Sequence, residues 1–115
     1  MSVIQIESEE DFSKLANFAP PYVIDFYADW CGPCKMLAPV FEELSNEVNA
    51  TFVKVNIEKS EVHKRYGVRN IPTVIVLTEV EAAPTATIVG SKTASVFKTL
   101  VTDAVEGITT NTFNK

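Results

Sequence analysis

Apolar residues gather in short runs along the chain, and these runs have the length and composition of β-strands. Residues 22–28 read YVIDFYA, a nearly continuous apolar run that is typical of a central strand covered on both faces. Residues 51–57 and 73–77 predict two further strands, and residues 3–6 predict a short first strand. A strand at residues 85–89 can pair antiparallel with residues 73–77. The pattern therefore predicts five strands.

Between these runs, apolar residues recur at spacings of three and four, which is the period of an amphipathic helix. Ser8 can cap a first helix whose opening turn is acidic, and Gly67 is well placed to end a short helix over residues 61–66. A longer helix begins at Pro33, and a last helix ends near Gly107. The apolar faces of these two helices consist of Leu37, Val40, Phe41, Leu44 and Val48 in one and of Val96, Phe97, Leu100, Val101, Ala104 and Val105 in the other.

The order of these elements predicts an α/β fold. Strands and helices alternate through the first three quarters of the chain, and a hairpin and a covering helix follow. We expect a central mixed sheet of five strands flanked by four helices, in the order βαβαβαββα. The length of 115 residues suits one domain, which we place at residues 1–107, and we expect the polar tail at residues 108–115 to be frayed.

The net charge and the hydropathy of the chain argue against two classes of partner, nucleic acids and membranes. The formal net charge is −5, and the resulting field repels nucleic acid and anionic membrane surfaces, so we expect neither as a partner. No apolar run approaches the ~20 residues that cross a bilayer, and the first ten residues lack the basic start and apolar stretch of a signal peptide. We therefore expect the protein to stay where it is made, in the cytoplasm.

The chain has only two cysteines, Cys31 and Cys34, and Trp30, Gly32 and Pro33 complete the active-site loop that carries them. Two cysteines leave no room for the disulfide framework of a small secreted domain. Cys31 falls where a strand ends and a helix begins, so unpaired backbone N–H groups and the helix dipole favour its thiolate. Cys34 projects from nearly the same side, close enough for a disulfide. We expect Cys31, at the exposed edge, to attack a substrate disulfide and Cys34 to resolve the mixed disulfide.

A Cys-x-x-Cys pair can also form half of a zinc site. Such a site needs two more ligands, and the chain offers no further cysteine and only one histidine, His63, which we interpret as a surface helix residue. A carboxylate can complete a zinc site in principle, but the Gly-Pro spacer and the following helix favour redox chemistry. We expect no metal, and no cofactor other than a reversible Cys31–Cys34 disulfide.

The segment from Val23 to Lys35, VIDFYADWCGPCK, closely resembles the active-site segment of the thioredoxin family. Residues 66–73, YGVRNIPT, resemble the segment that carries the cis-proline of the family, and nearly the whole chain aligns in order. The resemblance implies the thioredoxin fold and a thiol-disulfide oxidoreductase that reduces protein disulfides by dithiol-disulfide exchange. It also implies regeneration by a thioredoxin reductase, and we expect a monomer.

The resemblance assigns roles to two charged residues outside the loop. Asp25 matches the buried aspartate of the family, which accepts or relays the proton of Cys34, and Lys54 matches the lysine that neighbours this aspartate. From the residues alone, Asp25 is either buried, with a pKa raised toward the range of a general base, or turned toward solvent by strand alternation. Lys54 alone is compatible with an ordinary solvated strand lysine.

The resemblance also implies a surface for partners. Pro72 matches the cis-proline opposite the cysteines, which leaves the backbone of Ile71 free to pair with an extended substrate segment, whereas the sequence alone suggests a turn proline. Trp30, Ile71, Pro72, Val89 and Gly90 match the apolar rim against which the family docks its partners, and we call these five residues the docking rim. Singly, each of them is also compatible with ordinary surface or core.

Two features depart from the pattern of the family, and two other functions stay open. Asn70 stands where a small residue is common, which bears on the range of partners that the protein can bind, and residues 79–84 lack a tight-turn signal and predict a larger loop.

An oxidase or isomerase of the same fold is one alternative function, and a scaffold whose cysteines are incidental is the other. The Gly-Pro dipeptide and the missing signal peptide favour a reductant, and the intact site argues against a scaffold.

Overall fold

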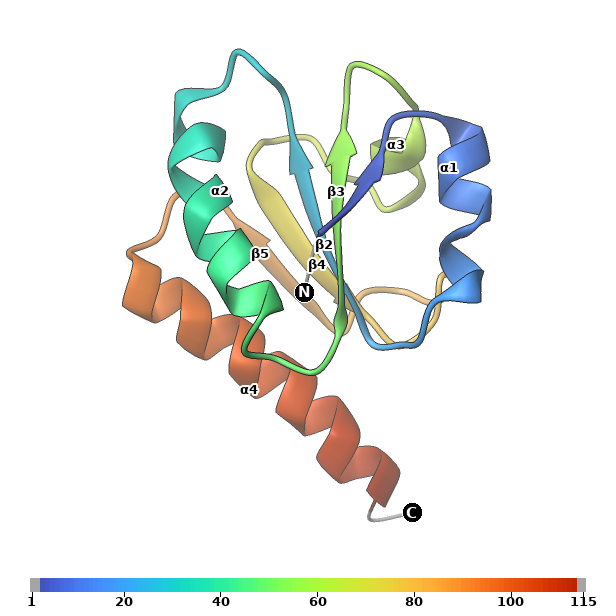
Figure 1. The fold of residues 1–115 in the computed structure, drawn as a ribbon, viewed down its shortest axis with the longest axis vertical. Coiled ribbons are helices and arrows are strands. Elements are labelled where there is room, and N and C mark those ends of the chain that lie inside the picture. The colour runs from blue at the N-terminus through green and yellow to red at the C-terminus, as the bar shows by residue number, and fades with distance from the viewer. Residues whose placement is uncertain (1–2, 114–115) are drawn as a thin grey trace.

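The computed structural model, which describes the backbone of residues 3–113 and the side chains of residues 3–108, places a five-stranded sheet between two pairs of helices (Figure 1). The elements follow one another in the order that the sequence predicts, with one added turn of 3₁₀ helix, η1, after α1. The strands are β1 (Ile4–Ile6), β2 (Tyr22–Tyr27), β3 (Thr51–Asn56), β4 (Thr73–Leu77) and β5 (Ala86–Val89), and the helices are α1 (Glu9–Ser13), η1 (Leu15–Asn17), α2 (Gly32–Ser45), α3 (Val62–Arg65) and α4 (Ala94–Phe113).

The sheet has the strand order β1-β3-β2-β4-β5. Strands β1, β3 and β2 run parallel, whereas β4 lies antiparallel to β2, and β5 lies antiparallel to β4. The predicted mixed sheet is therefore confirmed. Parallel neighbours end at the same edge of a sheet, so the residues that follow β2 and β3 meet at one end of the molecule.

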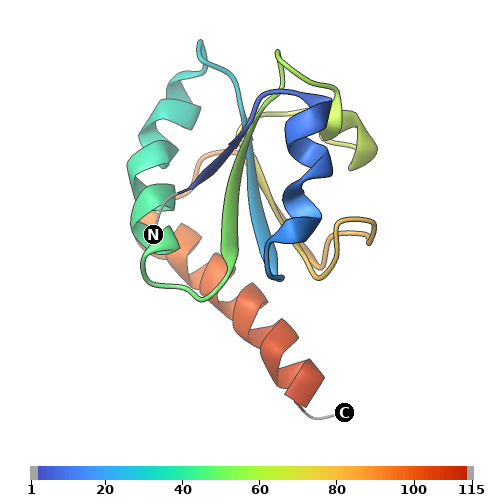
Figure 2. The same cartoon turned by 45° about the vertical axis from the view of Figure 1, so that its right-hand side comes forward.

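Each face of the sheet is covered by two helices, as Figure 2 shows, with α2 and α4 on one side and α1 and α3 on the other. The central strand β2 feeds both cores because successive side chains point to opposite faces. Its residues Tyr22, Ile24 and Phe26 pack in the core beneath α1 and α3. Val23 packs with Phe41 in the core beneath α2 and α4. Asp25, two residues after Val23, lies on this second face.

The ends of the first and third helices agree with the sequence signals. Ser8 caps α1, and its hydroxyl oxygen accepts a hydrogen bond from the backbone N–H of Asp11 at 3.0 Å. Gly67 follows α3 with a φ of +69°, the left-handed conformation in which glycine ends helices. The long loop before β5 packs on α3, where the Tyr66 hydroxyl donates to the backbone carbonyl of Val80 at 2.7 Å.

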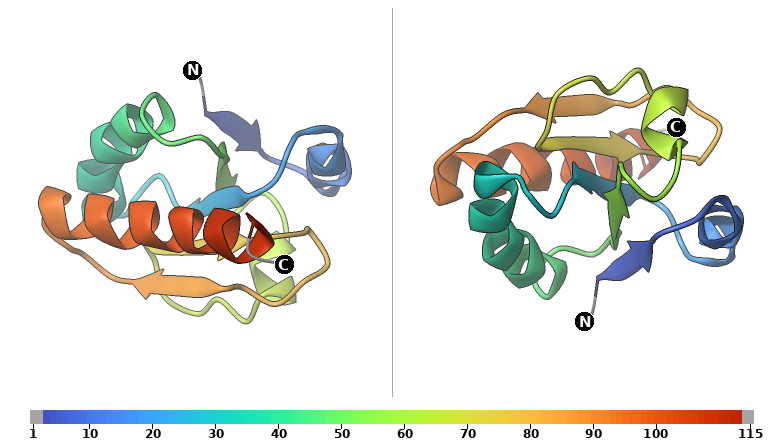
Figure 3. Two further views of the ribbon diagram at one scale, coloured as in Figure 1. Left: turned by 90° about the horizontal axis from the view of Figure 1, so that it is seen from below. Right: turned by 90° about the horizontal axis from the view of Figure 1, so that it is seen from above.

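The predicted end of the last helix near Gly107 is wrong. Helix α4 continues through this glycine to Phe113, and its last turns extend past the sheet at the end opposite the β2–α2 loop (Figures 1 and 2). In the view from below, α4 therefore lies in front of the sheet (Figure 3, left). Gly107 does not take the positive φ that would end a helix, and Ile108 beyond it packs against the core. The apolar face of α4 thus outlasts the glycine, and of the predicted tail only residues 114–115 lie outside the described residues. None of the helices in the described part of the chain is long and apolar enough to cross a membrane.

Candidate functional site

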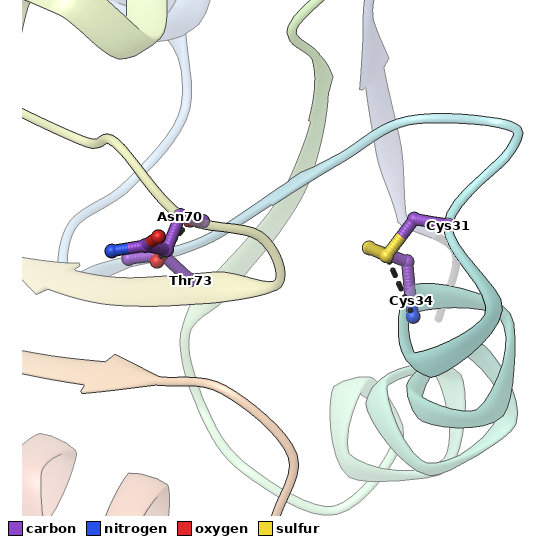
Figure 4. Close-up of a disulfide and its surroundings, with 4 residues drawn as sticks. All are labelled: Cys31, Cys34, Asn70 and Thr73. Carbon is purple, nitrogen blue, oxygen red and sulfur yellow. Dashed lines mark hydrogen bonds between the residues drawn. A yellow bond between two sulfur atoms is a disulfide. The ribbon is translucent and has the colours of Figure 1, made fainter.

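Cys31 and Cys34 lie where β2 gives way to α2, and their sulfur atoms form a disulfide with a Cα–Cα distance of 5.2 Å (Figure 4). Cys31 is the N-cap residue of α2, in extended conformation, and Pro33 occupies the first turn, where a missing N–H costs no hydrogen bond. The Cys31 sulfur accepts a hydrogen bond from the backbone N–H of Cys34 at 3.2 Å. The same sulfur faces the positive end of the 14-residue helix α2. Both features stabilise negative charge on Cys31.

The disulfide is covered by the surrounding chain. Cys31 has an exposed fraction of 5% and Cys34 of 3%, so the expectation that Cys31 lies at an exposed edge is wrong for this disulfide-bonded form. The sulfur of Cys31 lies against the first turn of α2, where it accepts the N–H of Cys34. By contrast, the neighbouring residue Trp30 is exposed to solvent, with an exposed fraction of 66%.

Asp25 is fully buried in β2 on the sheet face that α2 covers. Neither carboxyl oxygen has a hydrogen-bond partner among the described residues. Burial raises the pKa of Asp25 from 3.8 to about 7, although the positive charge of Lys54 lowers it in part. The interpretation of Asp25 as a solvent-facing strand residue is therefore wrong, and its carboxyl group can exchange a proton near neutral pH.

Lys54 stands directly beside Asp25 in the neighbouring strand, where the two residues are register partners between β2 and β3. The Lys54 nitrogen lies 4.2 Å from the ring centroid of Tyr27, so its charge is held over an aromatic face rather than free in solvent. This position lets Lys54 act on the carboxyl group of Asp25 electrostatically without an ion pair between them.

The segment from Asn70 to Thr73 carries a cis peptide bond between Ile71 and Pro72 and leads into β4 (Figure 4). The Thr73 hydroxyl donates to the carbonyl of Asn70 at 2.6 Å, and the carbonyl of Pro72 accepts from the N–H of Gly90 at 2.8 Å. Gly90 has a φ of +82°, a conformation that favours glycine. Within the described part of the chain, the backbone groups of Ile71 form no hydrogen bond.

Two grooves lie beside the active-site loop, and together they contain four of the five residues of the docking rim. The Trp30 groove, of about 530 Å³, contains Trp30 and Ile71 in its lining. The Pro72 groove, of about 320 Å³, contains Pro72 and Gly90 together with Pro33 from the active-site loop. Val89 lines neither groove, although 47% of its surface is exposed. The Trp30 indole N–H donates to a carboxylate oxygen of Glu58 at 2.8 Å and is thereby held in place.

No group of three or more cysteine, histidine, aspartate and glutamate side chains lies close enough to hold a metal ion among the described residues. A zinc site at the cysteine pair would need two further ligands, and none of the described side chains supplies them. The redox-capable group that the structure shows is the Cys31–Cys34 disulfide.

Comparison with known proteins identifies the family. A family model described as Thioredoxin matches residues 2–103. The chain is 45% identical over 80 residues to the thioredoxin of Bacillus subtilis, a match that covers 67% of this chain and 75% of that protein. It is 36% identical over 86 residues to the thioredoxin of Thiocapsa roseopersicina, which covers 70% and 94% of the two chains. The chain belongs to the thioredoxin family.

Solved structures of the family share the fold. The thioredoxin of Schistosoma mansoni superposes with a TM-score of 0.74 at 33% identity, and the match covers 87% of this chain and 94% of that one. Together with the Cys31–Cys34 disulfide, this likeness makes the chain a thiol-disulfide oxidoreductase that acts by dithiol-disulfide exchange.

Glu58 is the contact of this thioredoxin site that reasoning from the sequence missed. It follows the end of β3 by two residues, and Trp30 follows the end of β2 by three. Because β2 and β3 are parallel neighbours, their carboxyl ends share one edge of the sheet, and a carboxylate there can reach the indole. The predicted order of the strands alone does not show this neighbourhood, since the two strands are separated by α2 along the chain.

Proposed function

We propose that the chain is a disulfide reductant, in which the dithiol form of Cys31 and Cys34 reduces protein disulfides and a thioredoxin reductase restores the dithiol. The observation that carries the proposal is the position of the Cys31 sulfur at the N-terminus of α2, where it accepts the N–H of Cys34. A thiolate attacks disulfides and a thiol does not, so this stabilisation of negative charge supports Cys31 as the nucleophile.

The proposed cycle has two exchange steps. The Cys31 thiolate attacks one sulfur of the substrate disulfide, a mixed disulfide forms, and the other substrate sulfur leaves as a thiolate that takes up a proton. Cys34 then loses its proton to Asp25 and attacks the sulfur of Cys31, which breaks the mixed disulfide and releases the second substrate sulfur as a thiolate that takes up a proton. Two electrons pass to the substrate, and the chain ends as the Cys31–Cys34 disulfide.

Asp25 suits the role of proton acceptor because its carboxyl group is buried and has a pKa of about 7. Lys54 is proposed to modulate this pKa from the neighbouring strand, since its charge favours the ionised carboxylate. Neither group has to touch the substrate for these roles.

The docking rim is proposed to bind the substrate segment. The unpaired backbone groups of Ile71 can add an extended substrate segment as a further strand, next to the cis-proline Pro72. The exposed indole of Trp30, in one groove, and Gly90, in the other, are proposed to border this path on its two sides. Monomeric state and a cytoplasmic location stay predictions of the sequence.

The equilibrium reduction potential of the Cys31–Cys34 pair, measured against a dithiothreitol buffer, tests the direction of the reaction. We expect a value near −270 mV, which is a typical figure for thioredoxins and not one worked out from this structure. A value of about −120 to −180 mV would instead indicate a disulfide donor or isomerase. Absence of a reversible two-electron transition would favour a scaffold.

A trapping variant tests the roles of the two cysteines. Cys34→Ser leaves the nucleophile in place and removes the resolving thiol, so mixed disulfides should accumulate on Cys31. Cys31→Ser is the matched control and should accumulate none. Substrate captured through Cys34 in the control variant, and not through Cys31, would reverse the assignment.

A further inference from the structure

The Trp30 groove and the Pro72 groove differ in charge from two further grooves on the surface. Among the described residues, the only charged side chains that line the Trp30 groove, apart from the ionisable His63, are those of Lys64 and Arg69, and the only one that lines the Pro72 groove is that of Lys92. No carboxylate of residues 3–108 lines either groove. Two further grooves, which lie around the loop before β5, carry both signs of charge: Arg65 and Glu81 line both, and one of them also contains Glu9 and Glu79.

The positive charge of these two grooves is opposite in sign to the net charge of the chain. The formal net charge is −5, from 15 acidic and 10 basic residues, so acidic side chains are the more numerous ones in the whole protein although none lines these two grooves among the described residues. Lys64 forms an ion pair with Glu61 and is in part neutralised. Arg69 and Lys92 are exposed, and no ion pair within the described residues uses either of them.

Both free cations lie close to the backbone that the substrate is proposed to meet. Arg69 precedes Ile71 by two residues and lines the same groove as Trp30. Lys92 follows Gly90 by two residues, and its ammonium group donates to the carbonyl of Val89 at 2.7 Å, which holds it beside the docking rim. Two residues of extended chain span about 7 Å, a distance that long side chains bridge.

Two carboxylates near Trp30 have to be weighed against this pattern. Glu58 is bound to the indole N–H of Trp30, and Asp29 is exposed next to Trp30 in the chain. Neither lines the Trp30 groove or the Pro72 groove. An extended substrate segment that enters the Trp30 groove would therefore meet the positive charge of Arg69, and one that enters the Pro72 groove would meet that of Lys92.

We propose that Arg69 and Lys92 are specificity-determining residues that favour protein disulfides flanked by aspartate or glutamate within about three residues of the attacked cysteine. The inference rests on the proposed function, because it assumes that an extended substrate segment crosses from one groove to the other. Arg69 attracts a carboxylate on the side of Trp30, and Lys92 attracts one on the side of Pro72. The exchange chemistry is unchanged: two electrons still pass from the Cys31–Cys34 dithiol to the substrate disulfide.

The test uses three peptides that share one intramolecular disulfide and differ only at the second residue on each side of the cysteines, which is Glu, Gln or Lys. The protein is reduced, freed of reductant and mixed with each peptide, and the second-order rate constant is taken from acid-quenched samples by chromatography. At low ionic strength we expect the Glu peptide to react roughly three- to tenfold faster than the Gln peptide, as two exposed charge pairs allow. The Lys peptide should be the slowest.

Substitutions identify the residues responsible. Arg69→Gln and Lys92→Gln should each lower the Glu-to-Gln rate ratio by roughly two- to threefold, and the double variant should bring it to about 1. Lys14→Gln is the matched control, because Lys14 is an exposed lysine that lines none of the four grooves. It removes the same charge from the whole protein and should leave the ratio unchanged.

Ionic strength separates local attraction from the field of the whole protein. Raising the salt concentration to about 0.5 M should lower the Glu-to-Gln ratio if the two cations act, since salt screens exposed charges. If the net charge of −5 governs encounter, the Glu peptide is the slower one at low salt, and added salt raises its rate.

The results separate this inference from the proposed function. Equal rates for the Glu and Gln peptides, or a ratio that Lys14→Gln lowers as much as Arg69→Gln, would overturn the specificity while leaving disulfide reduction intact. Failure of the reduced wild-type protein to reduce any of the peptides would overturn the proposed function itself. Circular dichroism of each variant checks that the fold is retained.

Discussion

Replacement of Asp25 by asparagine should change the pH dependence of stability. The carboxyl group has a pKa of about 7 in the folded protein, against an ordinary value of 3.8. One pKa unit corresponds to about 1.4 kcal/mol, so ionising this buried group costs the folded state about 4 kcal/mol relative to the unfolded chain. An asparagine side chain carries no charge at any pH and does not incur this cost.

The sign follows from the number of protons that each state binds. Below pH 3.8 the carboxyl group is protonated in both states, and stability does not depend on it. Between pH 3.8 and about 7 the folded state keeps a proton that the unfolded state has lost, so the free energy of unfolding falls as the pH rises. Above pH 7 both states are ionised and the full penalty remains.

Urea unfolding of the disulfide-bonded protein from pH 4 to pH 8 measures this effect. As the pH rises across this range, the free energy of unfolding of the Asp25→Asn variant should increase by about 4 kcal/mol relative to that of the wild type. The change of the difference with pH is the quantity to compare, because the buried amide of the variant adds a constant cost of its own. Asp103→Asn, in which an exposed aspartate of α4 is replaced, is the control and should run parallel to the wild type.

Parallel curves for the wild type and Asp25→Asn would refute the argument, since a carboxyl group with an ordinary pKa loses no stability between pH 4 and pH 7. The same variant should also slow the release of mixed disulfides by up to about a hundredfold, at the low end of what a positioned general base contributes. A variant that gains stability above pH 7 and keeps its full rate would confirm the burial of Asp25 and exclude it as the proton acceptor.

Three further substitutions test the fold. Phe41→Ala empties a fully buried site on α2 and should cost about 3–5 kcal/mol in urea unfolding, whereas a cost below about 1 kcal/mol would mean that the core is not packed as described. Gly67→Ala should cost about 1 kcal/mol through backbone strain alone, because its φ is +69° and nothing lies near an added methyl group. Gly107→Ala should stabilise by about 0.5–1 kcal/mol, since this glycine lies inside α4 with open space around it, and a loss of stability there would contradict the continuous helix.

Local patterns of the sequence determined much of this molecule. The apolar run at residues 22–28 predicts the central strand, and the periods of three and four predict α2 and α4. The cysteine pair at the start of a helix predicts a redox site because the chemistry needs only neighbours three residues apart. These features depend on spacings along the chain, and spacings can be read without the fold.

Other features depend on which elements pack together, and only the tertiary structure decided them. Strand alternation allowed Asp25 to be buried or exposed, and the helix that covers its face of the sheet decided between the two. Gly107 is a signal for the end of a helix, but α4 continues past it, and Ile108 packs against the core beyond it. Arg69 and Lys92 are distant in sequence, and the hydrogen bond between Gly90 and Pro72 joins the two segments that carry them. Burial and charge patterns are properties of surfaces that the folded chain creates, which is why no spacing along the sequence predicts them.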